Sequence, residues 1–110
     1  MANWLAARGL VLYQRNYRSR LGEIDLIMAD DDTLVFVEVR YRSSMEFGGA
    51  EGSVTPAKQQ RIVRAARQYL GQHPEHSDRP CRFDVVAAGP SPDRDGKTHY
   101  HWIRNAFYGD

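Results

Sequence analysis

Two carboxylates and a cation stand near the middle of the chain, at Asp25, Glu38 and Arg40. Carboxylates on neighbouring strands can bind Mg²⁺ through hard oxygen ligands and leave positions open for water and a phosphate oxygen. A cation two residues beyond Glu38 lies on the same strand face, where it can stabilise charge that develops on a phosphate. The alternative from spacing alone is a set of solvated residues on the exposed face of an antiparallel sheet.

The stretch from Gly22 to Arg42 is predicted to form the β-hairpin that positions these side chains. Residues 22–28 and 34–40 alternate between apolar and polar side chains, and an acidic segment, Asp30-Asp31-Asp32-Thr33, separates them. We expect one face to carry Ile24, Leu26 and Met28 from the first strand, and one face to carry Val35, Val37 and Val39 from the second.

The register of this hairpin decides which charges meet. Pairing the strands symmetrically about the turn places Asp25 opposite Glu38, and Glu23 opposite Arg40. Like charges directly opposed on a sheet are destabilising, so the pair formed by Asp25 and Glu38 requires a stabilising partner, which is the reason sought for it. A shared divalent cation is such a reason, whereas Glu23 and Arg40 complement each other without one.

Length and composition indicate a single domain, residues 1–110, with 42% hydrophobic and 26% charged residues. The net charge of +1 does not mark the whole chain as a nucleic-acid-binding protein, so a basic surface requires local clustering. The lone Cys81 allows no intramolecular disulfide, which suits a cytoplasmic protein. No apolar run reaches the roughly 20 residues that a membrane span needs.

Further elements are predicted on both sides of the hairpin. Thr55 and Pro56 have the residue types of a helix start, and apolar residues recur on one face of the segment that follows. The predicted elements are a helix over Ala2–Arg8, a strand over Leu10–Tyr17, a glycine-rich loop over Ser43–Pro56, a helix over Lys58–Leu70, and strands over Cys81–Ala88 and Thr98–Ile103.

Local clusters of polar and basic residues are candidates for contact with nucleic acid. Lys58 and Gln59 fall near the apolar edge of their helix, so they can reach what the sheet presents. Arg61, Arg64 and Arg67 can follow a phosphate backbone, although a solvated helix face is the alternative. The full set of predicted nucleic-acid-binding residues is Arg18, Glu23, Arg42, Lys58, Gln59 and Arg61.

The segments GEIDLI, LVFVEVRYR, KQQRI, AARQYL and RFDVV occur in this order. In them the chain resembles the YraN-type family of small bacterial proteins, which is placed among the restriction-endonuclease-like, PD-(D/E)XK nucleases. The resemblance extends from about Trp4 to Phe107. It implies an α/β fold with a restriction-endonuclease-like core: a mixed central sheet of about five strands flanked by helices, in the order helix, three strands, helix, two strands.

The resemblance also implies an activity and a site. It implies Mg²⁺- or Mn²⁺-dependent hydrolysis of phosphodiester bonds in DNA, with Asp25 and Glu38 as metal ligands and Arg40 at the position of the motif lysine. A looser likeness to Holliday-junction resolvases points to branched DNA. Many nucleases of this fold dimerise, so the resemblance leaves both a monomer and a homodimer open.

Two departures from the superfamily pattern motivate a second hypothesis. Arg40 replaces a lysine, and because arginine stays charged only the electrostatic role transfers. Relatives usually carry a glutamate in the first helix, about a turn before Trp4, and that position falls ahead of Met1. The second hypothesis is a nucleic-acid-binding module of the same fold with lost or weak catalysis. A third is a protein-interaction domain that uses the loop over Ser43–Pro56.

Overall fold

A computed structural model describes residues 1–43, 54–91 and 93–109. The loop predicted over Ser43–Pro56 therefore lies outside the described residues except at its two ends. The elements are α1 (Ala2–Ala6), β1 (Val11–Arg18), β2 (Glu23–Asp30), β3 (Thr33–Tyr41), α2 (Pro56–Gln72), a short 3₁₀ helix η2 (Pro74–His76), β4 (Cys81–Pro90) and β5 (Thr98–Phe107).

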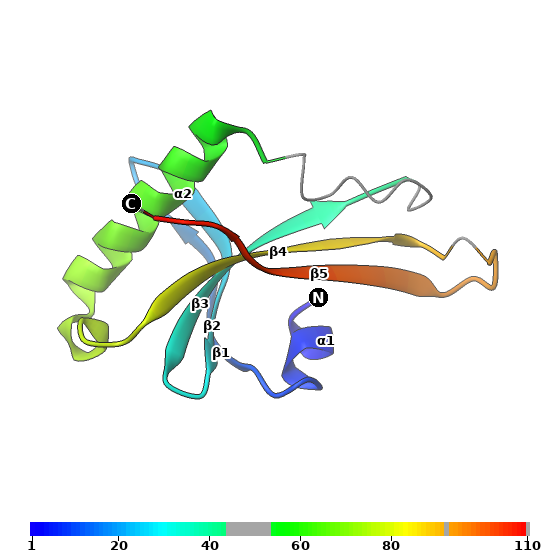
Figure 1. The fold of residues 1–110 in the computed structure, drawn as a ribbon, viewed down its shortest axis with the longest axis horizontal. Coiled ribbons are helices and arrows are strands. Elements are labelled where there is room, and N and C mark those ends of the chain that lie inside the picture. The colour runs from blue at the N-terminus through cyan, green and yellow to red at the C-terminus, as the bar shows by residue number, and fades with distance from the viewer. Residues whose placement is uncertain (44–53, 92, 110) are drawn as a thin grey trace.

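The strands form one mixed sheet in the order β1-β2-β3-β4-β5 (Figure 1). Strands β3 and β4 are parallel, and every other neighbouring pair is antiparallel. A parallel pair needs a crossover connection, which α2 supplies. The predicted α/β class, the five-stranded mixed sheet and the order of helices and strands are confirmed.

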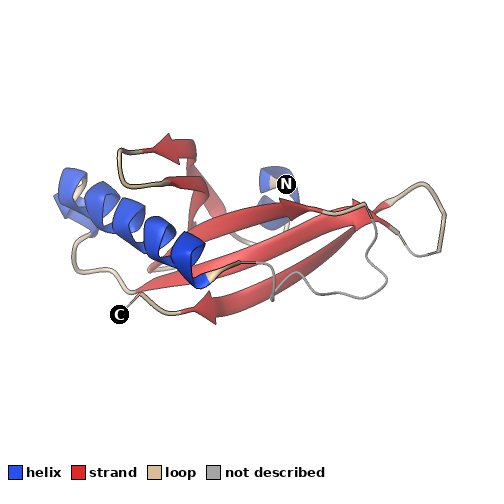
Figure 2. Cartoon of the chain, turned by 90° about the horizontal axis from the view of Figure 1, so that it is seen from above, coloured by secondary structure: helices blue, strands red, loops and turns tan. Residues whose placement is uncertain are grey.

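Helices cover opposite faces of the sheet, with α2 on one side and α1 on the other (Figures 1 and 2). The α2 face buries an apolar cluster that includes Phe36, Ile62, Tyr69 and Val85. The α1 face buries a second cluster, which comprises Ala2, Leu5, Leu10, Leu26, Met28, Val35, Val37 and Val86. Strand β3 lies between the two layers, so its residues from Leu34 to Glu38 are buried.

Helix α2 begins as its sequence predicts. The Thr55 side chain accepts the Lys58 main-chain N–H at 3.2 Å, and Pro56 occupies the first turn, where its missing N–H costs nothing. Ile62, Ala66 and Tyr69 are buried against the sheet. The cap fixes the backbone of Lys58, whose side chain belongs to the site described below.

The predicted faces of the hairpin are correct for β3 but wrong for part of β2. Leu26 and Met28 pack on the α1 face, whereas Ile24 packs on the α2 face. The cause is an irregularity around Asp25 and its neighbour on β1, Asn16. Asn16 has a φ of 51°, a left-handed conformation that asparagine tolerates. Arg15 pairs with Leu26 and Tyr17 pairs with Ile24, but Asn16 and Asp25 between them do not pair.

The far end of the sheet is fixed by a buried carboxylate that sequence patterns did not single out. Asp84 is completely buried and accepts hydrogen bonds from Arg82, from Trp102 Nε1 at 2.9 Å and from the Asn105 main-chain N–H at 3.1 Å. Asn105 has a φ of 52° and lies where the register between β4 and β5 shifts. Because Asp84 accepts the main-chain N–H of this bulge, β5 continues past its predicted end at Ile103 to Phe107.

Within the described ranges, no helix is long and apolar enough to cross a bilayer.

A candidate carboxylate site beside a basic cleft

Strands β2 and β3 part at Asp25. The backbone pairs run from Asp30/Thr33 to Leu26/Val37, which is the predicted register, and they end there. At the next position Asp25 Oδ2 accepts the Val39 main-chain N–H at 2.8 Å. A side chain thereby takes the place of a backbone carbonyl in the hairpin, and the Asp25 carboxylate is held between the two strands.

Glu38 is buried beside this carboxylate. Its side chain is 4% exposed, and its Oε2 atom lies 2.7 Å from Lys58 Nζ and 3.3 Å from Arg40 Nε. Lys58 comes from the first turn of α2, so the helix places a cation directly over the sheet. The prediction that Lys58 reaches what the sheet presents is confirmed.

The surroundings of Glu38 raise the pKa of its carboxyl above the ordinary 4.5. Burial is the largest cause, because it penalises the charged form. Repulsion from Asp25 and a hydrogen bond with it also raise the pKa, whereas the hydrogen bond and the charge of Lys58 lower it. The Asp25 and Glu38 side chains are therefore close enough for Asp25 to disfavour the charged form of Glu38.

The predicted contact between Glu23 and Arg40 is wrong. Glu23 forms its ion pair with Arg18 across β1 and β2, at 3.6 Å, and Arg40 lies against Glu38. The reason is that the pairing of β2 with β3 stops at Leu26, so symmetric extension of the register to Glu23 does not hold. Glu23 lies instead at the mouth of a cleft on the α2 side.

A depression of about 430 Å³ gives access to Asp25 from the α1 side of the sheet. Its lining residues are Met1, Arg15, Asn16, Asp25, Leu26, Val39 and Tyr41. Asp25 is half-buried at its floor, while Glu38 faces α2. Sequence reasoning did not place Asn16 or Tyr41 at the site, because the αL conformation of Asn16 and the parting of the strands are not encoded in a periodic pattern.

A second depression, of about 410 Å³, lies between the β1–β2 turn and the start of α2. We call it the basic cleft. It is lined by Arg18, Ser19, Arg20, Leu21, Gly22, Glu23, Lys58, Arg61 and Ile62. Four of the six residues predicted to contact nucleic acid therefore line one cleft, and Lys58 connects it to Glu38.

Gly22 allows this cleft to form. A Cβ atom at position 22 would lie 2.5 Å from the main-chain oxygen of Arg61, so only glycine lets the turn approach the helix this closely. The first residue of the GEIDLI segment thus has a packing role that its position in a hairpin did not indicate.

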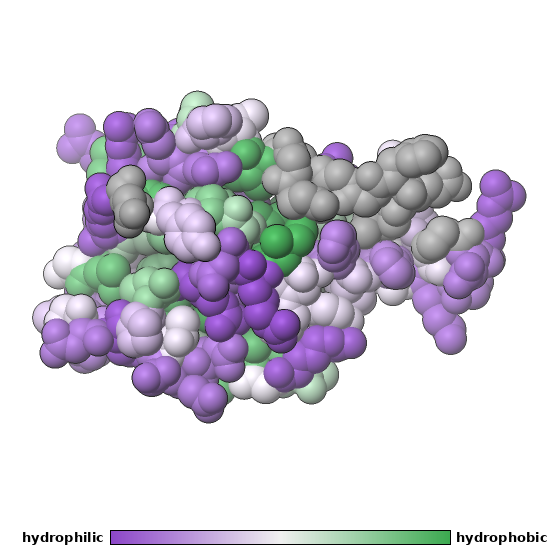
Figure 3. Space-filling view, in the orientation of Figure 1, coloured by the Kyte–Doolittle hydropathy of each residue, from purple (hydrophilic) through white to green (hydrophobic). Residues whose placement is uncertain are grey.

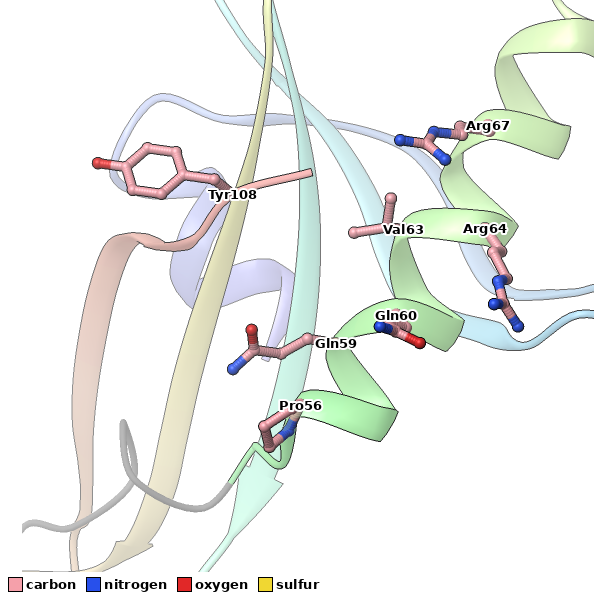
Figure 4. Close-up of a pocket in the computed structure, with 7 residues that line it drawn as sticks. All are labelled: Pro56, Gln59, Gln60, Val63, Arg64, Arg67 and Tyr108. Carbon is pink, nitrogen blue, oxygen red and sulfur yellow. The ribbon is translucent and has the colours of Figure 1, made fainter. Parts of the chain in front are cut away.

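The two other predicted nucleic-acid-binding residues lie elsewhere. Gln59 donates to the Val54 carbonyl oxygen and lines a groove of about 370 Å³ on the other flank of α2 (Figure 4). That groove also holds Arg64, Arg67 and Tyr108, and Arg67 donates to the Gly109 carbonyl oxygen at 2.8 Å. Arg42 follows β3, and its main-chain N–H donates to the Ala88 carbonyl oxygen.

The donor set of the site suits a hard divalent cation. Asp25 and Glu38 offer carboxylate oxygens from adjacent strands, and in the described part of the chain no cluster of three His, Cys, Asp or Glu side chains is present. Mg²⁺ characteristically takes one or two carboxylates and completes its shell with water and phosphate oxygens. Two carboxylates, one of which lines an open depression, fit such a cation, and they do not fit a closed structural metal site.

Comparison with known proteins identifies relatives of this chain. Residues 1–88 match the family model described as "Uncharacterised protein family UPF0102". A UPF0102 protein of Alcanivorax borkumensis is 50% identical, over 99% of this chain and 86% of that protein. Those of Nitrosomonas europaea and Aeromonas hydrophila are 53% and 56% identical, over 96% and 94% of this chain and 85% and 75% of each relative.

Proposed function

We propose that this chain, which belongs to the UPF0102 family, hydrolyses phosphodiester bonds in DNA with a divalent cation, Mg²⁺ or Mn²⁺, bound by Asp25 and Glu38. The observation that carries the proposal is the placement of two carboxylates where β2 and β3 part: Asp25 is bound to the Val39 N–H, and Glu38 is buried on the adjacent strand. Holding the buried carboxylate of Glu38 near a second carboxylate costs free energy, and cation binding offsets that cost.

Each group at the site has a separate role. A divalent cation bound there supplies a water of lowered pKa and neutralises charge on the phosphate. Val39 fixes the orientation of Asp25 through its N–H, and Arg40 holds Glu38 in place. Arg40 remains charged at every working pH, so its role is electrostatic rather than that of a proton carrier.

The charge of α2 supports DNA as the substrate. The helix carries four cations, Lys58, Arg61, Arg64 and Arg67, and no acidic residue, although the whole chain has a net charge of only +1. In the space-filling view, both hydrophilic and apolar side chains appear where α2 lies (Figure 3). Such a local excess of cations attracts phosphates without any base-specific contact.

The test is cleavage of linear and branched DNA with and without Mg²⁺ or Mn²⁺. We expect the wild type to cleave only with metal, and the Asp25→Ala/Glu38→Ala variant to be inactive while keeping its fold. As a charge-matched control, Glu75→Gln/Asp93→Asn removes two exposed carboxylates away from the site and is expected to cleave like the wild type. Cleavage that survives Asp25→Ala/Glu38→Ala would place the chemistry elsewhere.

One observation favours a second candidate, a nucleic-acid-binding module without catalysis. Glu38 is already neutralised by Lys58 and Arg40 before any metal binds. This candidate predicts salt-sensitive DNA binding with no cleavage under any metal. Arg64→Gln/Arg67→Gln should then reduce the salt dependence of binding by about one phosphate contact per arginine. Arg94→Gln/Lys97→Gln, at the distant β4–β5 turn, is the matched control and should leave the salt dependence unchanged.

A further inference from the structure

We propose that Lys58 is a built-in counter-ion, which competes with the divalent cation for Glu38 and moves into the basic cleft when a phosphate group enters it. The inference rests on the proposed function, because it concerns the same carboxylates. It adds a coupling between two ligands: phosphate in the basic cleft would strengthen cation binding at Asp25 and Glu38, and the cation would strengthen phosphate binding equally.

The contact geometry shows that Lys58 is the principal partner of Glu38. Its Nζ atom is 2.7 Å from Glu38 Oε2, against 3.3 Å for Arg40 Nε to the same oxygen. One oxygen of a buried carboxylate is therefore shared by two cations. A divalent cation that binds Glu38 must either share this carboxylate with Lys58 and Arg40 or replace one of these two side chains. Repulsion between cations at such distances is strong in a buried setting.

Lys58 is the cation that can leave. Its backbone is fixed because its N–H is bound by Thr55 at the helix start, but its side chain is 34% exposed. The same side chain lines the basic cleft with Arg18, Arg20 and Arg61. A lysine has a flexible four-carbon stem, so one fixed backbone position serves both Glu38 and the cleft.

Phosphate gives the displaced ammonium group a new partner. In the basic cleft, three arginines and Lys58 face a single acid, Glu23, which is already paired with Arg18. A phosphate group bound there would attract Lys58 away from Glu38 and leave Glu38 Oε2 with one cation fewer, because Arg40 remains beside it. The cation site would then be weak in the free protein and strong when nucleic acid is bound.

The test is calorimetric titration of Mn²⁺ into the wild type, Lys58→Met, Lys58→Arg and Arg64→Met, at about pH 8, where lysine is still charged. Methionine keeps the length and helix propensity of lysine without the charge. Lys58→Met should bind Mn²⁺ at least about 5-fold more tightly than the wild type, the lower end of typical coupling between sites. Lys58→Arg and Arg64→Met should stay near the wild type.

A second titration includes a short single-stranded oligonucleotide. If phosphate draws Lys58 into the basic cleft, the difference in Mn²⁺ affinity between wild type and Lys58→Met should narrow when the oligonucleotide is present. A difference that stays constant would refute the movement of Lys58, and equal or weaker Mn²⁺ binding by Lys58→Met would refute the competition. Neither result would refute hydrolysis at Asp25 and Glu38. Absence of Mn²⁺ binding in every variant would refute the metal site itself, and the inference with it.

Discussion

Asp25 Oδ2 accepts the main-chain N–H of Val39 at 2.8 Å, so a side chain from β2 terminates the backbone ladder of its own hairpin. This bond holds the Asp25 carboxylate between β2 and β3, near Glu38. Beyond Leu26 and Val37 the strands no longer pair, and the space between them admits the Asp25 side chain next to Glu38. The site is therefore a consequence of how the hairpin ends, and it should respond to changes there.

Removing the Asp25 acceptor should destabilise the metal-free protein. Asp25→Ala leaves the Val39 N–H without its partner, at an expected cost of about 1–3 kcal/mol in the free energy of unfolding. Asp25→Asn keeps an acceptor oxygen and relieves the repulsion with Glu38, so its cost should be smaller. Urea unfolding of the two variants without metal measures the difference, and equal costs would mean that the bond to Val39 is unimportant.

Replacing Gly22 should open the basic cleft. The Cβ atom of Gly22→Ala would meet the main-chain oxygen of Arg61 at 2.5 Å, so the turn must move away from α2 at a cost of about 1–3 kcal/mol. Gly71 lies in the same helix as Arg61, and a Cβ atom at position 71 would meet nothing within 4 Å. Gly71→Ala should therefore stabilise the protein, by up to about 1 kcal/mol. Thermal unfolding of both variants measures the two effects. Similar shifts in melting temperature would contradict the close approach of Gly22 to the Arg61 main chain.

The raised pKa of Glu38 predicts a pH dependence of stability in the metal-free protein. Its folded-state pKa exceeds the ordinary 4.5, chiefly through burial, so its contribution to stability is complete below 4.5 and is lost as the pH rises through the folded value. Glu38→Gln removes this titration. The free energy of unfolding of the wild type relative to Glu38→Gln should therefore fall as the pH rises above 4.5. Chemical denaturation of both proteins over that pH range measures this difference. If the difference in the free energy of unfolding stays constant or rises with pH, the prediction is wrong.

Much of the fold could be predicted because its signals are periodic or local. Thr55 and Pro56 have residue types that begin helices, and the acidic turn after Ala29 fixes the register of the hairpin correctly as far as Leu26 and Val37. Extending that register placed Asp25 beside Glu38, and Asp25 does raise the pKa of Glu38, although the backbone pairs end one position earlier.

What could not be predicted depends on irregular backbone and on distant contacts. Symmetric pairing wrongly placed Glu23 against Arg40, because nothing in the pattern of β2 indicates that Asp25 ends the ladder. The positive φ of Asn16, which turns Ile24 to the α2 face, leaves no periodic signal either. The spacing of Lys58 suggested that it reaches the sheet, but only the packing of α2 shows that it reaches Glu38.

The central claim is that the carboxylates of Asp25 and Glu38 support DNA hydrolysis with a bound divalent cation. The most direct measurement is the rate of Mg²⁺-dependent DNA cleavage by Asp25→Asn, which keeps the shape of the side chain and an acceptor for Val39. Loss of about 2.7 kcal/mol of transition-state stabilisation slows a reaction about 100-fold, and we expect a decrease of at least that size. A variant that is folded and cleaves at the wild-type rate would contradict the account.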